Sequence, residues 1–164
     1  MTEGRVELTE GVVYGHAGGR DLKANVFIPP GKPSNAPGVL MIHGGGWKNG
    51  SPDAVKGYGF LFGREGFVCV APEYRLTGEA GWPAQIHDVK AALRWMHANA
   101  EQLGLDTSRI AVMGNSAGGH LALMLAGTQN NPKFEGESGN AGARSDIAAV
   151  VNLDRKSTRL NSSH

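Results

Sequence analysis

The sequence predicts a single α/β domain, in which a mostly parallel sheet carries helices on both of its faces. Three observations predict this fold. From residue 38 onward, strand-like apolar runs take turns with helix-like segments, and one of these is a long amphipathic helix. Two earlier segments have the apolar–polar alternation of strands. The 164 residues suit one compact domain with a moderate core.

Residues 6–14 and 22–28 alternate apolar with polar side chains, so we expect an antiparallel pair joined by a loose turn over residues 15–20. Parallel strands are expected at 38–42 and 67–71. A helix over 54–64, which Gly57 and Gly59 weaken, is expected to connect these two strands.

The longest predicted helix runs over residues 83–103 and ends at Gly104. One of its faces is apolar at spacings of three and four residues: Ile86, Val89, Leu93, Met96 and Ala100. Residues 127–145 are rich in Gly, Asn and Ser, which predicts an exposed loop. A last strand is expected over residues 147–153.

Gly114–Gly118 has the pattern Gly-Asn-Ser-Ala-Gly and lies between a short apolar strand, 110–113, and an apolar helical run, 121–126. In this setting G-x-S-x-G forms a nucleophile elbow, a strained turn that presents the serine hydroxyl at the edge of the sheet. An ordinary glycine-rich turn would give the same five residues. Ser116 is therefore a candidate nucleophile.

A second motif favours the hydrolase interpretation. His43–Trp47 reads His-Gly-Gly-Gly-Trp and follows the apolar run Val39–Ile42. Loops of this HGGG type supply backbone N–H groups that stabilise an oxyanion in esterases and lipases. Two halves of one oxyanion site, each after a predicted strand and in the expected order, seldom coincide by chance.

With these motifs the chain resembles the α/β-hydrolase superfamily, and within it the esterases similar to hormone-sensitive lipase and their bacterial relatives that remove acetyl or feruloyl groups from plant polysaccharides. The likeness runs from about Val12 to Leu153. One departure is Asn115, because many relatives carry an acidic residue before the serine. Further matching stretches are Pro72–Leu76, Trp82–Asp88, Asp106–Ile110 and Gly118–Ala122.

The resemblance implies a role for each site residue. Ser116 attacks the ester carbonyl, and the backbone N–H groups of Gly45, Gly46 and Ala117 stabilise the tetrahedral oxyanion. His43 is expected to brace the loop rather than to act as the base.

The serine also needs a histidine held by a carboxylate, and in this fold the acid and then the histidine follow the serine along the chain. His120 is the only histidine between Ser116 and Leu153, and the resemblance implies that it packs beneath the sheet edge as a structural residue. The carboxylates available there are Glu135, Glu137 and Asp146. We expect the true acid and base to lie past residue 153.

Several other residues have structural interpretations. Arg75 and Asp88 are expected to form a polar brace behind the oxyanion loop, with substrate contact as the alternative, and Trp47 and Trp82 line either a substrate pocket or the core. A turn closed by an Asx interaction and a salt bridge is expected at one further pair, Asp106 and Arg109.

His16, His87 and His97 share no spacing with carboxylates or cysteines that suggests a metal site, and no cofactor is implied. The lone Cys69 lies in a predicted buried strand, which indicates a core residue.

Composition favours a small-molecule substrate, and the family resemblance implies that it is an ester. Charged residues make up 19% of the chain and the formal net charge is +1, so neither nucleic acid nor an anionic membrane is expected. The apolar runs are far shorter than the roughly 20 residues that span a bilayer, and Met1–Arg5 leads into no signal-like segment. A cytoplasmic protein is expected, and the oligomeric state stays open.

Residues 154–164 break abruptly with the pattern before them and match, codon for codon, the translation of a widely used sequencing adapter. We expect this tail to be non-native, so that residues 1–153 form a partial domain cut after about its sixth strand. The tail carries a net charge of +2, and subtracting it from +1 leaves −1 for residues 1–153.

The leading functional hypothesis is a serine carboxylesterase acting on short acyl esters, with carbohydrate acetyl esters as a candidate. As a fragment without the triad acid and histidine, the chain is expected to be inactive. A non-catalytic ligand-binding module of the same fold is one alternative. A formamidase or peptidase is another.

Overall fold

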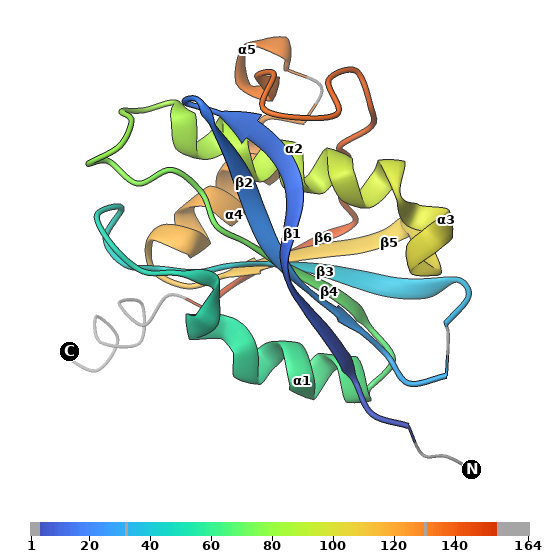
Figure 1. The fold of residues 1–164 in the computed structure, drawn as a ribbon. Helices are drawn as coiled ribbons and strands as arrows, with labels where there is room; N and C mark the ends of the chain where they lie inside the picture. The colour runs from blue at the N-terminus through green and yellow to red at the C-terminus, as the bar shows by residue number, and fades with distance from the viewer. Residues whose placement is uncertain (1–3, 32, 130, 154–164) are drawn as a thin grey trace, which may run out of the picture.

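The computed structural model describes residues 4–31, 33–129 and 131–153, and six strands and five α-helices lie within them (Figure 1). The elements are β1 (Glu7–Ala17), β2 (Arg20–Ile28), β3 (Ala36–Ile42), a 3-10 turn (Pro52–Val55), α1 (Lys56–Arg64), β4 (Val68–Pro72), α2 (Ala84–Ala98), α3 (Ala100–Leu103), β5 (Leu105–Gly114), α4 (Ala117–Gly127), α5 (Pro132–Glu135) and β6 (Ala149–Asn152).

The six strands form one sheet in the order β1-β2-β4-β3-β5-β6. The pairs β1–β2 and β2–β4 are antiparallel, whereas β4–β3, β3–β5 and β5–β6 are parallel. The predicted mostly parallel sheet with an opening antiparallel pair is therefore confirmed. The turn of the opening hairpin is tighter than expected, because Gly18 and Gly19 both have positive φ angles of 63° and 77° and let the strands extend to Ala17 and Arg20.

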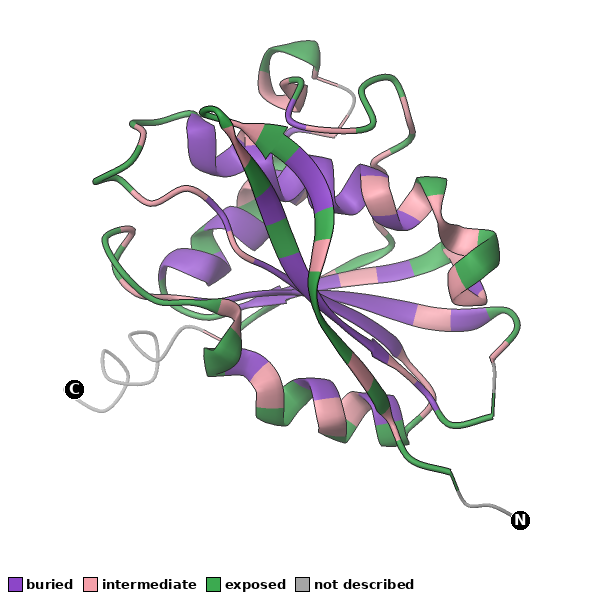
Figure 2. Ribbon diagram, in the orientation of Figure 1, coloured by how far each residue is buried: buried purple, intermediate pink, exposed green. Residues whose placement is uncertain are grey.

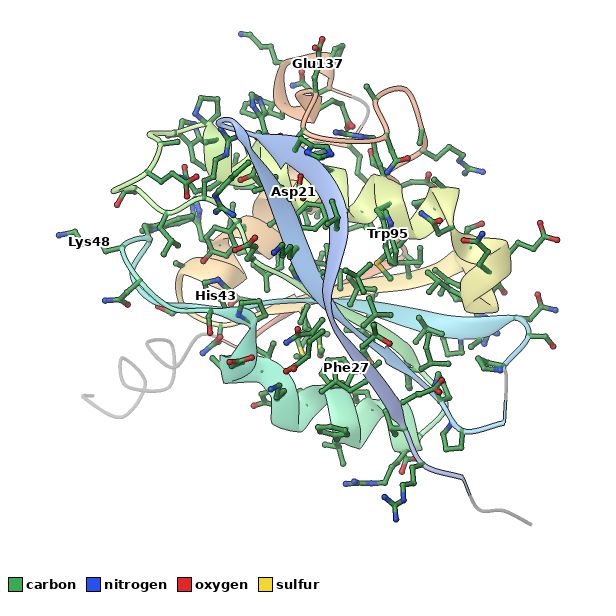
Figure 3. All side chains as sticks on the ribbon, viewed as in Figure 1. Asp21, Phe27, His43, Lys48, Trp95 and Glu137 are labelled. Atoms are coloured by element: carbon green, nitrogen blue, oxygen red, sulfur yellow. The ribbon has the colours of Figure 1, made fainter. Side chains whose placement is uncertain are left out.

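Helices cover both faces of the sheet, as predicted: α1 lies on one face, and α2 and α4 lie on the other (Figure 1). Side chains of β3 alternate between two clusters, because Val39 and Met41 pack on the α1 side and Leu40 and Ile42 on the opposite side. On the α1 side, the Phe27 ring meets Phe60 edge to face at 5.3 Å (Figure 3). Figure 2 shows the buried residues concentrated on the central strands and the helix sides that face them.

The helix predicted over residues 83–103 is interrupted, which corrects the sequence-based expectation. It ends at Ala98, and α3 starts at Ala100 after Asn99. The Asn99 side chain donates a 2.9 Å hydrogen bond to the carbonyl oxygen of Trp95, so it competes for a backbone partner within the helix. Gly104 ends the second piece with φ of 68°, as the sequence predicted.

Residues 127–145 are not simply an exposed loop, and this prediction was wrong in part. They include α5, and Ser138 is 5% exposed. The cause is charge on α2, where Lys90 and Arg94 are buried. The carboxylate of Glu135 lies 3.1 Å from Lys90 Nζ and 2.8 Å from Arg94 Nη1, so the loop folds inward to neutralise two buried cations.

The last described strand, β6, is shorter than the predicted 147–153 and forms an edge of the sheet. Its side chains are exposed or half-buried. The predicted tail at 154–164 lies outside the described residues. Among the described residues there is no helix of sufficient length and apolarity to span a membrane.

Candidate active site

The candidate site lies where two neighbouring parallel strands end. β3 and β5 pair in a register that sets Ile42 opposite Gly114. His43 and Asn115, the next residues of each strand, therefore begin two loops at the same edge of the sheet. Residues more than seventy positions apart in sequence meet here because carboxyl ends of parallel strands share one edge.

The turn after β5 has the geometry expected of a nucleophile elbow. Ser116 has φ of 54° and ψ of −122°, a strained conformation for any residue with a side chain, and it is exposed. The glycines on either side permit this turn. A Cβ at Gly118 would lie 2.6 Å from the carbonyl oxygen of His43, and one at Gly114 would lie 2.8 Å from the backbone nitrogen of Gly119.

The loop after β3 lies directly against this elbow. A Cβ at Gly44 would lie 2.8 Å from the carbonyl oxygen of Asn115 and 3.2 Å from Ser116 Cβ. The next two residues, Gly45 and Gly46, have φ angles of 136° and 66°, which favour glycine. The structure therefore brings the predicted oxyanion loop and the predicted nucleophile together.

The third predicted donor, Ala117, is the first residue of α4, so its N–H has no partner within the helix. Across the described part of the chain, no hydrogen bond uses the N–H of Gly45, Gly46 or Ala117. Among the described residues, these three N–H groups therefore have no hydrogen-bond partner.

His43 lies beneath the loop, 1% exposed, rather than beside the serine. Its Nδ1 lies 2.7 Å from the carbonyl oxygen of Gly44, and because a carbonyl only accepts, Nδ1 carries the proton. Burial lowers the pKa of His43, partly offset by that hydrogen bond, which favours the neutral ring. These contacts agree with the expected bracing role.

Tyr74 supports His43, a role that sequence reasoning did not assign. The two rings stack with centroids 4.4 Å apart, and the Tyr74 hydroxyl donates a 2.8 Å hydrogen bond to the carbonyl oxygen of His43. Burial raises the pKa of Tyr74 to about 12, so the phenol stays a donor. The only sequence signal for Tyr74 was its place in Pro72–Leu76, one of the stretches that match the family.

Arg75 and Asp88 form the expected ion pair behind the loop. Asp88 is fully buried, and its carboxylate accepts hydrogen bonds of 2.8–2.9 Å from the Arg75 backbone N–H and guanidinium and one of 3.1 Å from Ser138. Because Arg75 follows β4 and Asp88 lies in α2, the ion pair connects these two elements. At Asp106 and Arg109 the predicted Asx interaction and salt bridge are present, since the Asp106 carboxylate accepts a 2.9 Å hydrogen bond from the Ser108 N–H and lies 3.0 Å from Arg109 Nε. The predicted turn is not, because both residues lie within β5, where its register with β3 shifts.

His120 does not pack beneath the sheet edge, which corrects the prediction. It is exposed on the first turn of α4, and its ring meets Trp47 edge to face at 5.4 Å. Trp47 meets Trp82 in the same manner at 6.4 Å. Trp47 is half-buried and Trp82 is 50% exposed, so of the two alternatives the core is excluded for Trp82.

Among the described residues, no side-chain hydrogen bond joins the Ser116 hydroxyl to a histidine or a carboxylate, whose bonds go to other partners. The three later carboxylates are placed elsewhere. Glu135 is bound to Lys90 and Arg94, Asp146 pairs with Arg144, and Glu137 lies near α5, away from His43 (Figure 3).

A cavity of about 330 Å³ lies beside the oxyanion loop. His43, Lys48, Tyr74 and Leu76 contribute to its walls, together with the ion cluster that Arg20 forms with Glu73 and Glu79. Ser116 is not among the residues that line this cavity. A second cavity, of about 590 Å³, lies between α5 and residues 142–146 and is lined by none of the predicted site residues.

Comparison with known proteins identifies the family. The family model BD-FAE matches residues 24–156, most of the chain. The chain belongs to the BD-FAE family. Among curated relatives of this BD-FAE member, esterase LipC of Mycobacterium tuberculosis is 39% identical over 126 residues, and carboxylesterase NlhH of the same species is 42% identical over 114. These alignments cover 76% and 68% of the chain but 30% and 35% of the relatives.

Solved structures agree on the fold. The butyrate-bound form of a thermophilic esterase, Est2 of Thermogutta terrifontis, superposes on the BD-FAE chain with a TM-score of 0.77 and 28% identity. The match covers 91% of this chain and 53% of the esterase. The chain therefore has a partial α/β-hydrolase fold and is a member of the serine esterases related to hormone-sensitive lipase. It spans about a third of the length of the curated relatives it matches.

Proposed function

We propose that Ser116 is the nucleophile of a carboxylic-ester hydrolase and that the N–H groups of Gly45, Gly46 and Ala117 form its oxyanion hole. One contact carries this proposal: Gly44 lies against Ser116, so the oxyanion loop and the elbow face the same reacting carbonyl. The strained backbone at Ser116 supports it, because such strain persists where it serves a site.

In the proposed reaction a base takes the Ser116 proton while the hydroxyl oxygen bonds to the acyl carbon. The carbonyl oxygen becomes negatively charged and accepts hydrogen bonds from the three backbone N–H groups. The C–O bond to the alcohol then breaks, and the alcohol leaves with the proton. Water hydrolyses the acyl-serine to a carboxylic acid and restores the hydroxyl.

We propose that the triad acid and histidine come from sequence outside the described residues. The relatives support this, because the chain spans only 30% of LipC and 35% of NlhH. In a serine protease, loss of the catalytic histidine alone lowers turnover by about a millionfold, so the 164-residue chain by itself should lack triad activity. Residues 1–153 would then be a partial domain.

Short acyl esters are the proposed substrates. The Est2 structures have butyrate and propionate bound, which supports a small acyl group, and acetyl esters of carbohydrates are the finer candidate. An amide is the second candidate, because arylacetamide deacetylase of Oryctolagus cuniculus is 38% identical over 113 residues.

The test uses the full-length product of the gene that encodes this chain. We expect it to hydrolyse p-nitrophenyl acetate and butyrate, and Ser116→Ala to lower kcat by about 10⁴-fold or more. Ser108→Ala, at the opposite end of β5, is the matched control and should leave kcat unchanged. An unchanged rate in Ser116→Ala would remove Ser116 from the mechanism, and no turnover of esters or amides would favour the binding-module alternative.

A covalent probe tests the nucleophile directly. Esterase 2 of Thermogutta terrifontis is known phosphorylated by paraoxon, so we expect paraoxon to inactivate the full-length protein and to label the peptide that contains Ser116. Label on any other serine would contradict the assignment.

A further inference from the structure

Trp47 holds an unusual backbone conformation next to the oxyanion glycines. Its φ angle is 73°, in the left-handed region that bulky side chains rarely adopt. Such a conformation persists only where neighbouring contacts impose it. Trp47 directly follows Gly46. The contacts that fix Trp47 therefore also help to orient the proposed oxyanion donors of this loop, the N–H groups of Gly45 and Gly46.

Besides packing against the large core cluster, Trp47 makes three specific contacts. The rings of His120 and Trp82 meet it edge to face, with interplanar angles of 83° and 87°. The third contact is a 2.8 Å hydrogen bond from the Thr77 N–H to the Trp47 carbonyl oxygen. Edge-to-face aromatic pairs are attractive because the positive edge of one ring meets the negative face of the other.

The three contacts differ in what they connect. Thr77 and Trp82 both belong to the segment between β4 and α2, whereas His120 belongs to α4. The backbone N–H of His120 donates a 3.0 Å hydrogen bond to the carbonyl oxygen of Ser116, one turn earlier. Of the three, only the His120 ring therefore joins Trp47 to the helix that follows Ser116 and begins at Ala117.

We infer that His120 is a positioning residue, which holds the oxyanion loop in register with the nucleophile helix through its ring contact with Trp47. It acts on neither substrate nor proton. Its imidazole makes no hydrogen bond among the described residues, so the shape and edge of the ring carry the effect. This inference rests on the proposed function of Ser116, Gly45 and Gly46.

The test compares three variants of the full-length protein. His120→Ala removes the ring, His120→Phe keeps a ring but can neither donate nor take a proton, and His16→Ala removes an exposed imidazole in the β1–β2 hairpin. Steady-state kinetics with p-nitrophenyl butyrate separates kcat from KM. The rate of inactivation by paraoxon reports attack on a phosphoryl centre whose oxygen also needs the oxyanion hole.

We expect His120→Ala to lower kcat by about 10- to 100-fold, because misplacing an oxyanion donor weakens only transition-state binding. KM should stay within about twofold, and paraoxon inactivation should slow in parallel with kcat. His120→Phe should recover most of the lost rate, and His16→Ala should match the wild type.

Two outcomes would overturn the inference. If His120→Ala keeps the wild-type kcat, the ring does not position the loop. If His120→Phe is as slow as His120→Ala while both keep the wild-type melting temperature, the imidazole acts through its nitrogen atoms instead. Failure of the proposed function looks different, because Ser116→Ala would then stay active whatever His120 does.

Discussion

The Tyr74 hydroxyl donates a 2.8 Å hydrogen bond to the carbonyl oxygen of His43, at the first residue of the proposed oxyanion loop. This bond joins the end of β4 to the end of β3, and both partners are almost fully buried. The carbonyl group at the start of this loop is therefore held by the segment that follows β4.

Removing this hydrogen bond should destabilise the protein without unfolding it. Tyr74→Phe keeps the ring that stacks on His43 but leaves a buried carbonyl oxygen without its partner, which costs about 1–3 kcal/mol. Urea denaturation of the full-length protein should show a lower midpoint with an unchanged slope. Tyr58→Phe, on an exposed ring of α1, is the control, and equal midpoints for both variants would contradict the role of the bond.

The close approach of Gly44 to the elbow makes it intolerant of a side chain. Gly44→Ala would bring Cβ to 2.8 Å from the Asn115 carbonyl oxygen, so the loop must move away from Ser116. We expect kcat for p-nitrophenyl acetate to fall by about 100-fold or more. Gly57→Ala on α1 meets open space and should keep full activity, with stability equal or slightly higher. Normal kcat in Gly44→Ala would show that the loop tolerates displacement.

The buried Asp88 carboxylate should contribute strongly to stability. Asp88→Asn leaves the Arg75 guanidinium, 13% exposed, without its counter-charge, and breaking a buried pair costs about 3–5 kcal/mol. Asp146→Asn breaks the exposed pair with Arg144 and should cost less than about 1 kcal/mol. Chemical denaturation measures both. If the two variants lose similar amounts of unfolding free energy, burial does not determine how much an ion pair contributes to stability.

His43 should make stability depend on pH. Burial lowers its pKa below the ordinary value of about 6.5, so between these two values the unfolded chain binds more protons than the folded one. The free energy of unfolding is therefore highest above about pH 6.5 and falls as the pH drops through that window. Urea midpoints measured at pH 7.5, 6.5 and 5.5 give this dependence.

The contribution of His43 is isolated by substitution. His43→Asn removes the titrating group, so its midpoint should fall less steeply between pH 7.5 and 5.5 than that of the wild type. Identical slopes for wild type and His43→Asn would assign the dependence to other groups.

The parts of the site predicted from sequence depend on short-range rules. Glycines at 114 and 118 around Ser116 specify a turn that few other residues allow, and the same holds for Gly45 and Gly46. The positive φ at Ser116 follows from that spacing. Hydrophobic periodicity likewise predicted the strands and the buried face of α2.

Two of the errors share one cause, which is contact between distant segments. The composition of residues 127–145 is typical of a loop, yet buried Lys90 and Arg94 draw Glu135 inward. The family resemblance implied a buried place for His120. The structure instead pairs its ring with Trp47, more than seventy residues away, and no local pattern could indicate that contact.

The sequence by itself determined that this protein has a strained Gly-x-Ser-x-Gly turn and a glycine-rich loop, each after a strand of an α/β sheet. Both are local backbone arrangements that glycine spacing and apolar periodicity encode directly. Only the tertiary structure decided how the two motifs meet, through the pairing of Ile42 with Gly114 and the contact of Gly44 with Ser116. Strand register and side-chain packing join distant residues, so they emerge only when the whole sheet forms.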